Sequence, residues 1–175
     1  MQAELKSHFD RLEKSKAEIR QFYSGYSEAE LNAPPAPGKW GALQHMAHIL
    51  SSETMGLGYM KKKIQGADKA GRSGLRENTM SFLLKAFLKS GIKFKAPSVL
   101  QEPAAHYTVD ALFAAWDGLR EEYVRFLDPM DDRMAHTLIY KHPMAGRLNP
   151  AQALDFMGIH LDRHIRAAKK GLKKK

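Results

Sequence analysis

Residues 149–170 read NPAQALDFMGIHLDRHIRAAKK and give the clearest evidence for the fold. Asn149 followed by Pro150 is typical of a helix N-cap and the first helical position. Apolar residues then recur at spacings of three and four, which predicts an amphipathic helix with one buried face. His160 and His164 lie on the inward side of this helix, where residues four apart are neighbours, so two imidazoles can converge on one metal ion. The pair supplies half of a metal site.

Apolar periodicity along the rest of the chain predicts four long helices in total. Their expected ranges are 4–23, 39–65, 108–128 and 149–170. The amphipathic segment 79–90 is expected to form an accessory helix. Residues 92–103 contain prolines and no helical period, so we expect an extended crossover there. Apart from one short extended piece at Thr137–Tyr140, the sequence predicts an all-α protein: a four-helix bundle with a short accessory helix and a long crossover.

Polar residues that can cap helices mark several of these boundaries. Ser27, followed by Glu28 and Glu30, predicts a short helical turn, and Thr108 is expected to cap the third long helix. Asn78 is the expected cap of the accessory helix. The apolar faces comprise Leu43, Ala47, Leu50, Thr54 and Leu57 in the second long helix and Phe82, Leu83, Ala86 and Phe87 in the accessory helix.

The length of 175 residues fits a single domain spanning residues 1–175, with 43% hydrophobic and 27% charged residues as in globular proteins. The absence of cysteine excludes disulfides, thiolate zinc sites and cysteine nucleophiles, so a metal must be bound by His, Asp or Glu. The charged, amphipathic N-terminus is unlike a secretion signal, and no stretch approaches the ~18 apolar residues of a membrane span. We therefore expect a cytoplasmic protein without a membrane anchor.

The formal net charge of +9 at pH 7 raises the question of an anionic partner. Part of this charge comes from the lysine runs at 61–63 and 173–175, and residues 169–175 are expected to form a flexible basic tail. No aromatic RNA-binding signature, zinc finger or Gly-rich phosphate loop accompanies the lysines, so no specific nucleic-acid function is expected. A solvated basic surface is the simplest interpretation.

The second long helix offers a third histidine for the pair at His160 and His164. In WGALQHMAHIL, residues 40–50, His48 lies beside the apolar face and can point into the bundle. His45 is either an outer partner of a ligand or an exposed side chain, and we expect it to be exposed. Spacing alone also permits ordinary hydrogen-bonded core histidines at these positions.

These motifs resemble those of the DinB/YfiT-like metalloenzymes, a family of four-helix bundles. Trp40, followed by His48 and two aliphatic residues, is similar to the motif in the family's second helix. The loop HPMAGRL at residues 142–148, with His160 and His164 after it, is similar to the motif at the last helix. The resemblance covers nearly the whole chain and implies that His48, His160 and His164 are metal ligands.

The resemblance also implies a divalent-metal-dependent enzyme, with zinc or nickel as the expected ion. Three imidazoles leave a coordination position for water or substrate, as in catalytic sites. Characterised relatives include transferases and isomerases that use a low-molecular-weight thiol such as bacillithiol or mycothiol. The expected activity is therefore thiol S-transfer, or a hydrolase-like reaction, on a small molecule. Trp40 and His142 are candidate pocket residues, and no residue is identified as the general base.

The alternative function is a non-catalytic, stress-related bundle protein that binds a metal or small ligand, with the basic surface engaging an anionic partner. Trp40 then serves as a packing anchor. Glu53, Asp155 and Asp162 are interpreted as surface charges unless one reaches the free N–H of a ligand. His142 is expected mainly to fix its loop. The family resemblance also implies a homodimer.

Overall fold

The computed structural model describes residues 1–90, 104 and 106–172. Seven α-helices make up most of this part of the chain, in agreement with the predicted all-α class. They are α1 (Ala3–Tyr23), α2 (Glu28–Asn32), α3 (Ala42–Ile64), α4 (Leu75–Lys89), α5 (Val109–Leu127), α6 (Asp132–Ala135) and α7 (Pro150–Leu172). A short 3-10 turn at Ala67–Lys69 follows α3, and the strands β1 (Tyr140–His142) and β2 (Gly146–Leu148) precede α7.

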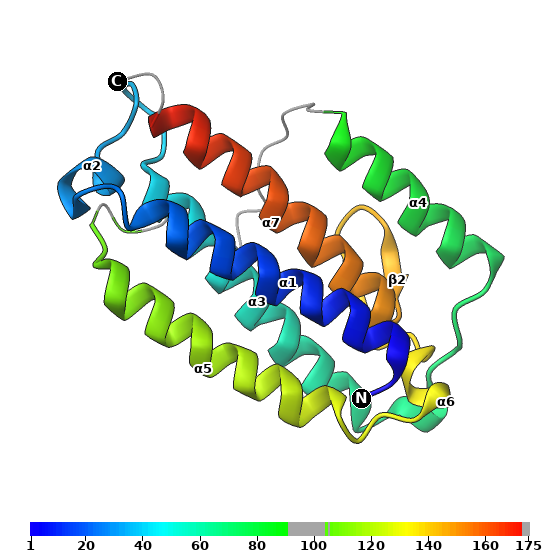
Figure 1. Cartoon of the computed structure of the whole chain (residues 1–175). Helices are drawn as coiled ribbons and strands as arrows, with labels where there is room; N and C mark the ends of the chain where they lie inside the picture. Colours follow the sequence, from blue (N-terminus) through cyan, green and yellow to red (C-terminus); the bar gives the residue numbers. More distant parts are fainter. Residues whose placement is uncertain (91–103, 105, 173–175) are drawn as a thin grey trace.

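The four long helices α1, α3, α5 and α7 form the predicted four-helix bundle (Figure 1). α7 packs against both α1 and α3, and α5 packs against α3 and α1. α1 and α7 run in one direction and α3 and α5 in the other, so α3 and α7 are antiparallel neighbours. α4 lies outside the bundle and packs along α7. The two helices that carry the predicted histidine ligands are therefore in contact.

The C-terminal helix is longer than expected. α7 extends to Leu172 and so passes residue 169, where the sequence predicted a flexible tail. That prediction placed the boundary too early, because Ala168 and Leu172 are buried and continue the apolar period of the helix. The last three residues of the expected tail, and the expected crossover at 92–103, lie outside the described residues.

Side-chain caps explain where several helices begin. The Asn149 side-chain oxygen accepts a hydrogen bond from the Gln152 N–H at 2.8 Å, and Pro150 occupies the first helical position of α7. Thr108 caps α5 through the Ala111 N–H, as predicted. Ser27 and Glu30 exchange hydrogen bonds at the start of α2, in a capping box. The local sequence signals for these three helices are confirmed.

The predicted start of α4 was wrong. The helix begins at Leu75 rather than after Asn78. The Glu77 carboxylate accepts the Gly74 N–H at 2.9 Å, which satisfies one of the amides left free at the helix start. Glycine is a weaker N-cap signal than Asn, and for this reason the sequence favoured the later position.

The buried face of α4 also differs from the prediction. Phe82 and Leu83 are 66% and 53% exposed. The buried residues of the helix are instead Ser81, Leu84 and Leu88. Because α4 lies outside the bundle and packs mainly along α7, only a narrow stripe is covered, and the choice of stripe depends on a neighbour distant in sequence.

The buried face of α3 is wider than the single stripe that was predicted. Leu43, Ala47 and Leu57 are buried as expected, but Leu50 is only half-buried and Thr54 is exposed. The other buried residues of the helix are Ala42, Met46, His48, Ile49, Glu53, Gly56 and Met60. α3 contacts α2, α5, α7 and β1, and these neighbours cover more than one side of it.

A β-hairpin lies between α6 and α7. Its strands pair antiparallel, with His142 opposite Gly146. Gly146 has a φ of +74°, a conformation that side chains disfavour and that this tight turn requires. The sequence predicted an extended piece at 137–140, of which Tyr140 alone belongs to the hairpin. The prediction began too early in the chain, because the position of β1 depends on its pairing with β2. Gly146 and Arg147 of β2 have low strand propensity, so the sequence did not indicate this strand.

The core contains a buried ion pair that the sequence did not predict. Glu53 of α3 and Arg120 of α5 are 2% and 3% exposed, and their charged groups lie 2.9 Å apart. The Trp116 indole N–H donates to the Glu53 carboxylate at 2.7 Å, and the Tyr123 hydroxyl donates to the Glu53 backbone carbonyl at 2.9 Å. The Arg120 guanidinium also lies 2.8 Å from the Glu13 carboxylate of α1. We call Glu53, Arg120, Trp116, Tyr123 and Glu13 the Glu53 network. Glu53 is therefore not the surface charge that was expected.

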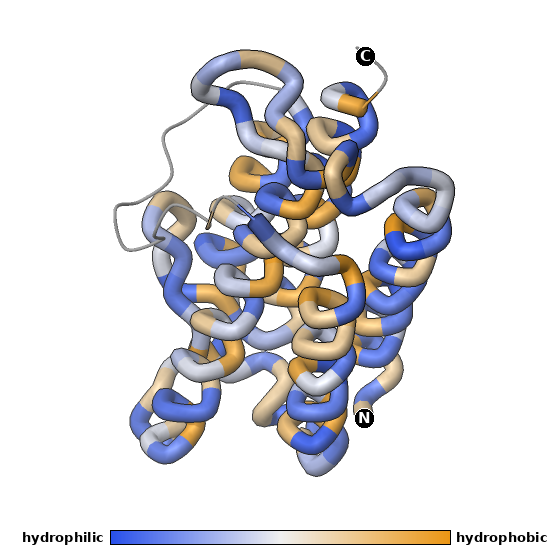
Figure 2. Tube along the Cα trace, turned by 90° about the vertical axis from the view of Figure 1, so that its left-hand side faces the viewer, coloured by the Kyte–Doolittle hydropathy of each residue, from blue (hydrophilic) through white to orange (hydrophobic). Residues whose placement is uncertain are grey.

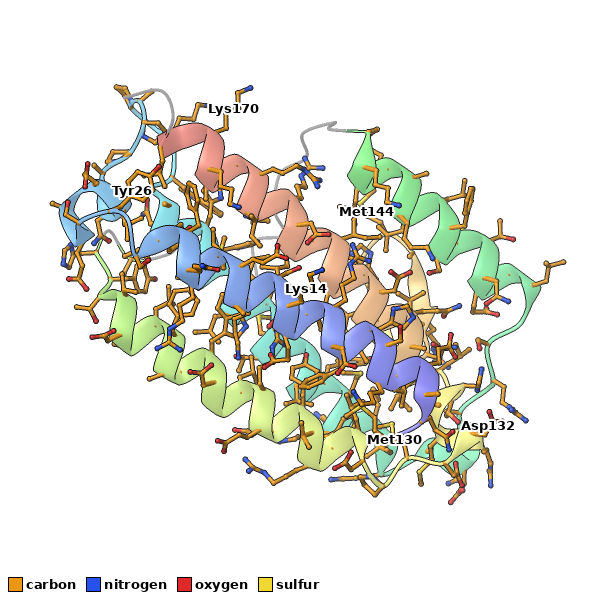
Figure 3. All side chains as sticks on the ribbon, viewed as in Figure 1. Lys14, Tyr26, Met130, Asp132, Met144 and Lys170 are labelled. Carbon is orange, nitrogen blue, oxygen red and sulfur yellow. The ribbon has the colours of Figure 1, made fainter. Side chains whose placement is uncertain are left out.

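Apolar and basic residues are segregated between the inside and outside of the bundle. In Figure 2 orange and blue alternate along the turns of each helix, as in amphipathic helices. Lys14 of α1 and Lys170 of α7 are exposed and belong to the basic surface (Figure 3). None of the helices in the described part of the chain combines the length and the apolar character that a membrane span requires.

Candidate metal centre

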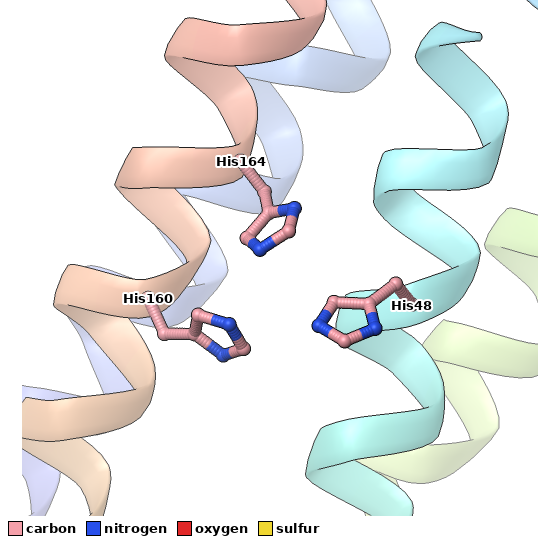
Figure 4. A group of neighbouring side chains, drawn as sticks. All are labelled: His48, His160 and His164. Atoms are coloured by element: carbon pink, nitrogen blue, oxygen red, sulfur yellow. The ribbon is translucent and has the colours of Figure 1, made fainter. Parts of the chain in front are cut away.

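His48, His160 and His164 lie together across the interface between α3 and α7 (Figure 4). One ring nitrogen from each residue lies within 4.8 Å of those of the other two. The ring centroids are 5.4 Å apart for His48 and His160, 4.7 Å for His48 and His164, and 4.8 Å for His160 and His164. In Figure 4 each ring turns a nitrogen towards the space between them. We call these three residues the histidine cluster.

The packing of α3 on α7 positions the cluster. His160 and His164 lie one turn apart on α7 and face His48 of α3. Further along α3, a Cβ atom on Gly56 would lie 2.5 Å from the Met157 side chain, so this glycine allows the two helices to approach closely. At Gly58, the other glycine of the helix, a Cβ would meet nothing within 4 Å.

Burial keeps the cluster in the neutral form that binds metals. Burial lowers the pKa of His48. Burial, followed by the neighbouring histidines and Arg163, lowers the pKa of His160 to about 3. The same causes, burial first, hold the pKa of His164 well below its usual range. At neutral pH the three rings therefore offer unprotonated nitrogens.

His45 also contacts the cluster. Its Nδ1 lies 3.0 Å from Nδ1 of His164, and its side chain is half-buried. Burial, with a smaller contribution from His48, lowers the pKa of His45 to about 4. The expectation that His45 is exposed was wrong, because its partner is on a helix far along the chain.

Trp40 packs beside the cluster just before α3. Its ring centroid is 5.1 Å from that of His48, 5.4 Å from that of His45 and 6.2 Å from that of His164. Trp40, His45 and His164 are partly exposed, whereas His48 and His160 are buried. The cluster therefore reaches the surface on the side where Trp40 lies.

His142 and His160 share a neighbour, Phe156. Phe156 is 4.5 Å from His142 and 5.5 Å from His160, measured between ring centroids. Nδ1 of His142 accepts hydrogen bonds from the Met144 and Ala145 N–H groups, each at 3.2 Å. These bonds fix the hairpin turn and require that the proton of the neutral ring is on Nε2. Burial lowers the pKa of His142 to about 4, so the ring is neutral at pH 7.

The acidic residues of α7 make ion pairs outside the cluster. Asp155 contacts Lys85 at 2.8 Å and Arg11 at 3.3 Å, and Asp162 contacts Arg11 at 2.6 Å. These carboxylates are partly buried and join α7 to α1 and α4. The ring of His164 thus lies at hydrogen-bond distance from an imidazole, that of His45, whereas these carboxylates pair with Arg11 and Lys85.

Comparison with known families gives a match over most of the chain. A family profile described as DinB superfamily matches residues 11–168. The chain belongs to the DinB superfamily. This membership confirms the resemblance inferred from the motifs around Trp40 and in residues 142–164. Searches of curated proteins and of solved structures find no match to this DinB chain.

The cluster of this DinB chain fits a divalent metal ion. Imidazole nitrogens bind zinc at ~2.0–2.1 Å, so nitrogens that already lie within 4.8 Å of one another need only small ring movements to share an ion. Neutral imidazoles suit zinc, nickel, copper and iron. Within the described residues, the group of mutually close ligand atoms comprises three histidines and no carboxylate, which leaves coordination positions free for other ligands.

Sequence reasoning missed two residues around the site. His45 was expected to be exposed, and Phe156 was not singled out. The spacing of His45 and His48 on one helix was the only available signal for the first, and it did not reveal the partner, His164. Phe156 precedes His160 by one helical turn, and stacks on its ring with an interplanar angle of 14°.

Proposed function

We propose that this DinB chain is a divalent-metal-dependent enzyme that transfers a low-molecular-weight thiol to a small electrophilic substrate. The observation that carries the proposal is the convergence of three neutral imidazoles at a site that reaches the surface beside Trp40. A sealed structural site would have four protein ligands, whereas three leave room for a substrate. Membership of the DinB superfamily is consistent with this arrangement.

The ligands of the proposed site are His48, His160 and His164, with zinc or nickel as the ion. A bound ion would supply Lewis acidity and lower the pKa of a coordinated thiol. The chain contains no cysteine, so the nucleophilic thiol has to come from a cosubstrate. The role of the protein is then to hold the ion and to place the electrophile beside it.

Two further residues are assigned to the pocket. Trp40 borders the open side of the cluster and offers an apolar ring against which a substrate can pack. His142 carries its proton on Nε2, because Nδ1 already accepts two backbone N–H groups. Because His142 is buried against Phe156 beside His160, we propose it for the inner wall of the pocket and not for its open side.

A non-catalytic role in metal binding is the second candidate. The observation that favours it is that Asp155 and Asp162 are already engaged by Arg11 and Lys85, so neither is free to act as a general base. The same three ligands would serve this second function. The two candidate functions differ in whether the protein catalyses turnover of a substrate.

Metal analysis tests the site. Protein purified without a His-tag and reconstituted with zinc or nickel is expected to hold about one ion per chain. His48→Ala and His160→Ala are expected to lose it. His106→Ala removes an exposed histidine and is the matched control that should keep the ion. Absence of metal from the reconstituted wild-type protein would overturn the proposal.

A conjugation assay separates enzyme from binder. The wild-type protein loaded with metal is incubated with bacillithiol or mycothiol and a model electrophile, and thioether formation is followed. Activity that disappears in His164→Ala supports the proposed transfer. Activity that is unchanged in this variant contradicts the metal route, and stoichiometric metal without turnover favours the non-catalytic function.

A further inference from the structure

His45 makes a contact that neither a packing role nor a surface role explains. Its Nδ1 lies 3.0 Å from Nδ1 of His164, on the neighbouring helix. Nitrogen atoms of two neutral imidazoles approach this closely when one carries a proton and the other accepts it. The contact is therefore a hydrogen bond, and its direction determines which nitrogen of His164 has a free lone pair.

The position of His164 in the cluster decides that direction. Its two ring nitrogens have separate neighbours: Nδ1 meets His45, and Figure 4 shows a nitrogen turned towards His48 and His160. For that nitrogen to bind an ion it must be unprotonated, so the proton of the neutral ring has to be on Nδ1. His164 then donates the hydrogen bond and Nδ1 of His45 accepts it.

We infer that His45 is a positioning residue, which holds the His164 ring in the tautomer and orientation that bind the metal. The inference rests on the metal site of the proposed function. The other ring nitrogen of His45 carries its proton, and because the side chain is half-buried, this N–H can be hydrated. Hydrogen-bond partners of this kind orient a ligand imidazole and raise its basicity.

Trp40 supports the same arrangement. Its ring is stacked on that of His164, with an interplanar angle of 28° and centroids 6.2 Å apart, and lies edge-on to His45 at 5.4 Å. The two imidazoles are thus confined by an aromatic neighbour as well as by their hydrogen bond. His45 lies one turn before His48 on α3, so the same helix supplies a ligand and the support for another ligand.

Two variants of His45 test the inference. His45→Leu removes the acceptor and keeps an apolar side chain of similar bulk. His45→Asn replaces the ring but places an amide oxygen near the position of Nδ1, where it can still accept from His164. Zinc affinity, measured by competition with a chromophoric chelator, is expected to fall about 10–100-fold in His45→Leu and to be largely retained in His45→Asn.

The protonation of His164 provides a readout that does not require metal. Long-range proton–nitrogen NMR spectra of the metal-free wild-type protein, with labelled histidine, should show the His164 proton on Nδ1. In His45→Leu the signal is expected to shift towards a mixture of tautomers. Far-UV circular dichroism checks that both variants are folded. If His45→Leu does not fold, the NMR spectrum of the wild-type protein still tests the inference, because it shows which nitrogen of His164 carries the proton.

The outcomes distinguish a failure of the proposed role of His45 from a failure of the proposed metal site. The role of His45 is overturned, and the metal site is left intact, by either of two results in a protein whose wild type binds zinc. One is an unchanged zinc affinity in His45→Leu, and the other is a His164 proton on Nε2. A wild-type protein that binds neither zinc nor nickel overturns both. A zinc affinity that is lowered in His45→Leu and retained in His45→Asn supports the inference, because an acceptor atom would not rescue a purely structural role.

Discussion

The Glu53 network and the histidine cluster are two polar regions inside one bundle, and both include residues of α3. In the Glu53 network each charge has a partner: the carboxylate of Glu53 meets a guanidinium and an indole N–H. In the histidine cluster one nitrogen of each of three neutral rings points towards the same space, and no carboxylate belongs to this group in the described part of the chain. Paired charges can be explained by the fold alone. Three imidazole nitrogens that converge could instead hold a cation, and for this reason we propose the cluster as the functional region.

Breaking the Glu53 network should have the largest effect on stability. Arg120→Met leaves the Glu53 carboxylate buried without its cation, and the free energy of unfolding is expected to fall by about 3–5 kcal/mol. The double variant Glu53→Met/Arg120→Met should recover much of this loss, because no uncompensated charge remains. Urea denaturation of the metal-free proteins measures both. A loss below about 1 kcal/mol in Arg120→Met would show that water or another group compensates Glu53.

A substitution in the histidine cluster should affect function more than stability. His160→Phe retains an aromatic ring next to Phe156, and the free energy of unfolding of the metal-free protein is expected to change by less than about 1.5 kcal/mol. Zinc affinity should fall more than about 100-fold, because one of three ligands is removed. Denaturation and chelator competition are measured on the same preparation. A large loss of stability would show that the fold requires His160, as it is expected to require the Glu53 network.

Acid should destabilise the protein through its buried histidines. The pKa of His160 is about 3 and that of His142 about 4 in the folded protein, whereas the pKa of an unfolded histidine is ~6.5. As the pH falls below 6.5 the unfolded chain binds protons first, so the free energy of unfolding decreases until the folded pKa is reached. Each such histidine contributes up to ~1.4 kcal/mol per pH unit.

Denaturation of the metal-free protein at pH 7, 6 and 5 checks this pH dependence. Wild type should lose stability steadily, and His160→Phe should show a shallower slope because one titrating ring is gone. Equal slopes for the two proteins would mean that His160 takes up a proton in the folded state in mild acid.

The smallest expected effect concerns the packing of α3 near the Glu53 network. Gly56→Ala forces the Met157 side chain to move and should lower the free energy of unfolding by about 1–2 kcal/mol. Gly58→Ala is the matched control: its added methyl meets open space, and the higher helix propensity of alanine should stabilise by about 0.5–1 kcal/mol. Thermal denaturation compares the two. Equal responses would show that the α3–α7 contact is looser at Gly56 than the structure indicates.

Features encoded by neighbouring residues were predictable from the sequence. Asn149 with Pro150, and Thr108, marked the starts of α7 and α5, because a cap is made with residues three positions away. The spacing of His160 and His164 likewise placed both rings on one helical face. His48 required the family motif as well, since nothing local distinguishes a ligand from an ordinary core histidine.

Features that depend on distant residues were not predictable. Glu53 has the appearance of a surface charge until Arg120 of α5 is placed against it. The partner of His45 is His164, on the last helix of the chain. Phe82 was assigned to the apolar face of α4, but the position of α7 decides which side of α4 is covered. In each case the missing information was the packing of two helices that are far apart in sequence.

The division of the ligands between α3 and α7 has a consequence for biosynthesis. His48 is translated early, but His160 and His164 follow only after most of the other helices have been made. A nascent chain that stops short of α7 contains one ligand, so the site forms only once α7 has packed against α3. Loading of the proposed metal would thus be a late step in the maturation of the protein, and a bound ion would report that α7 has packed against α3.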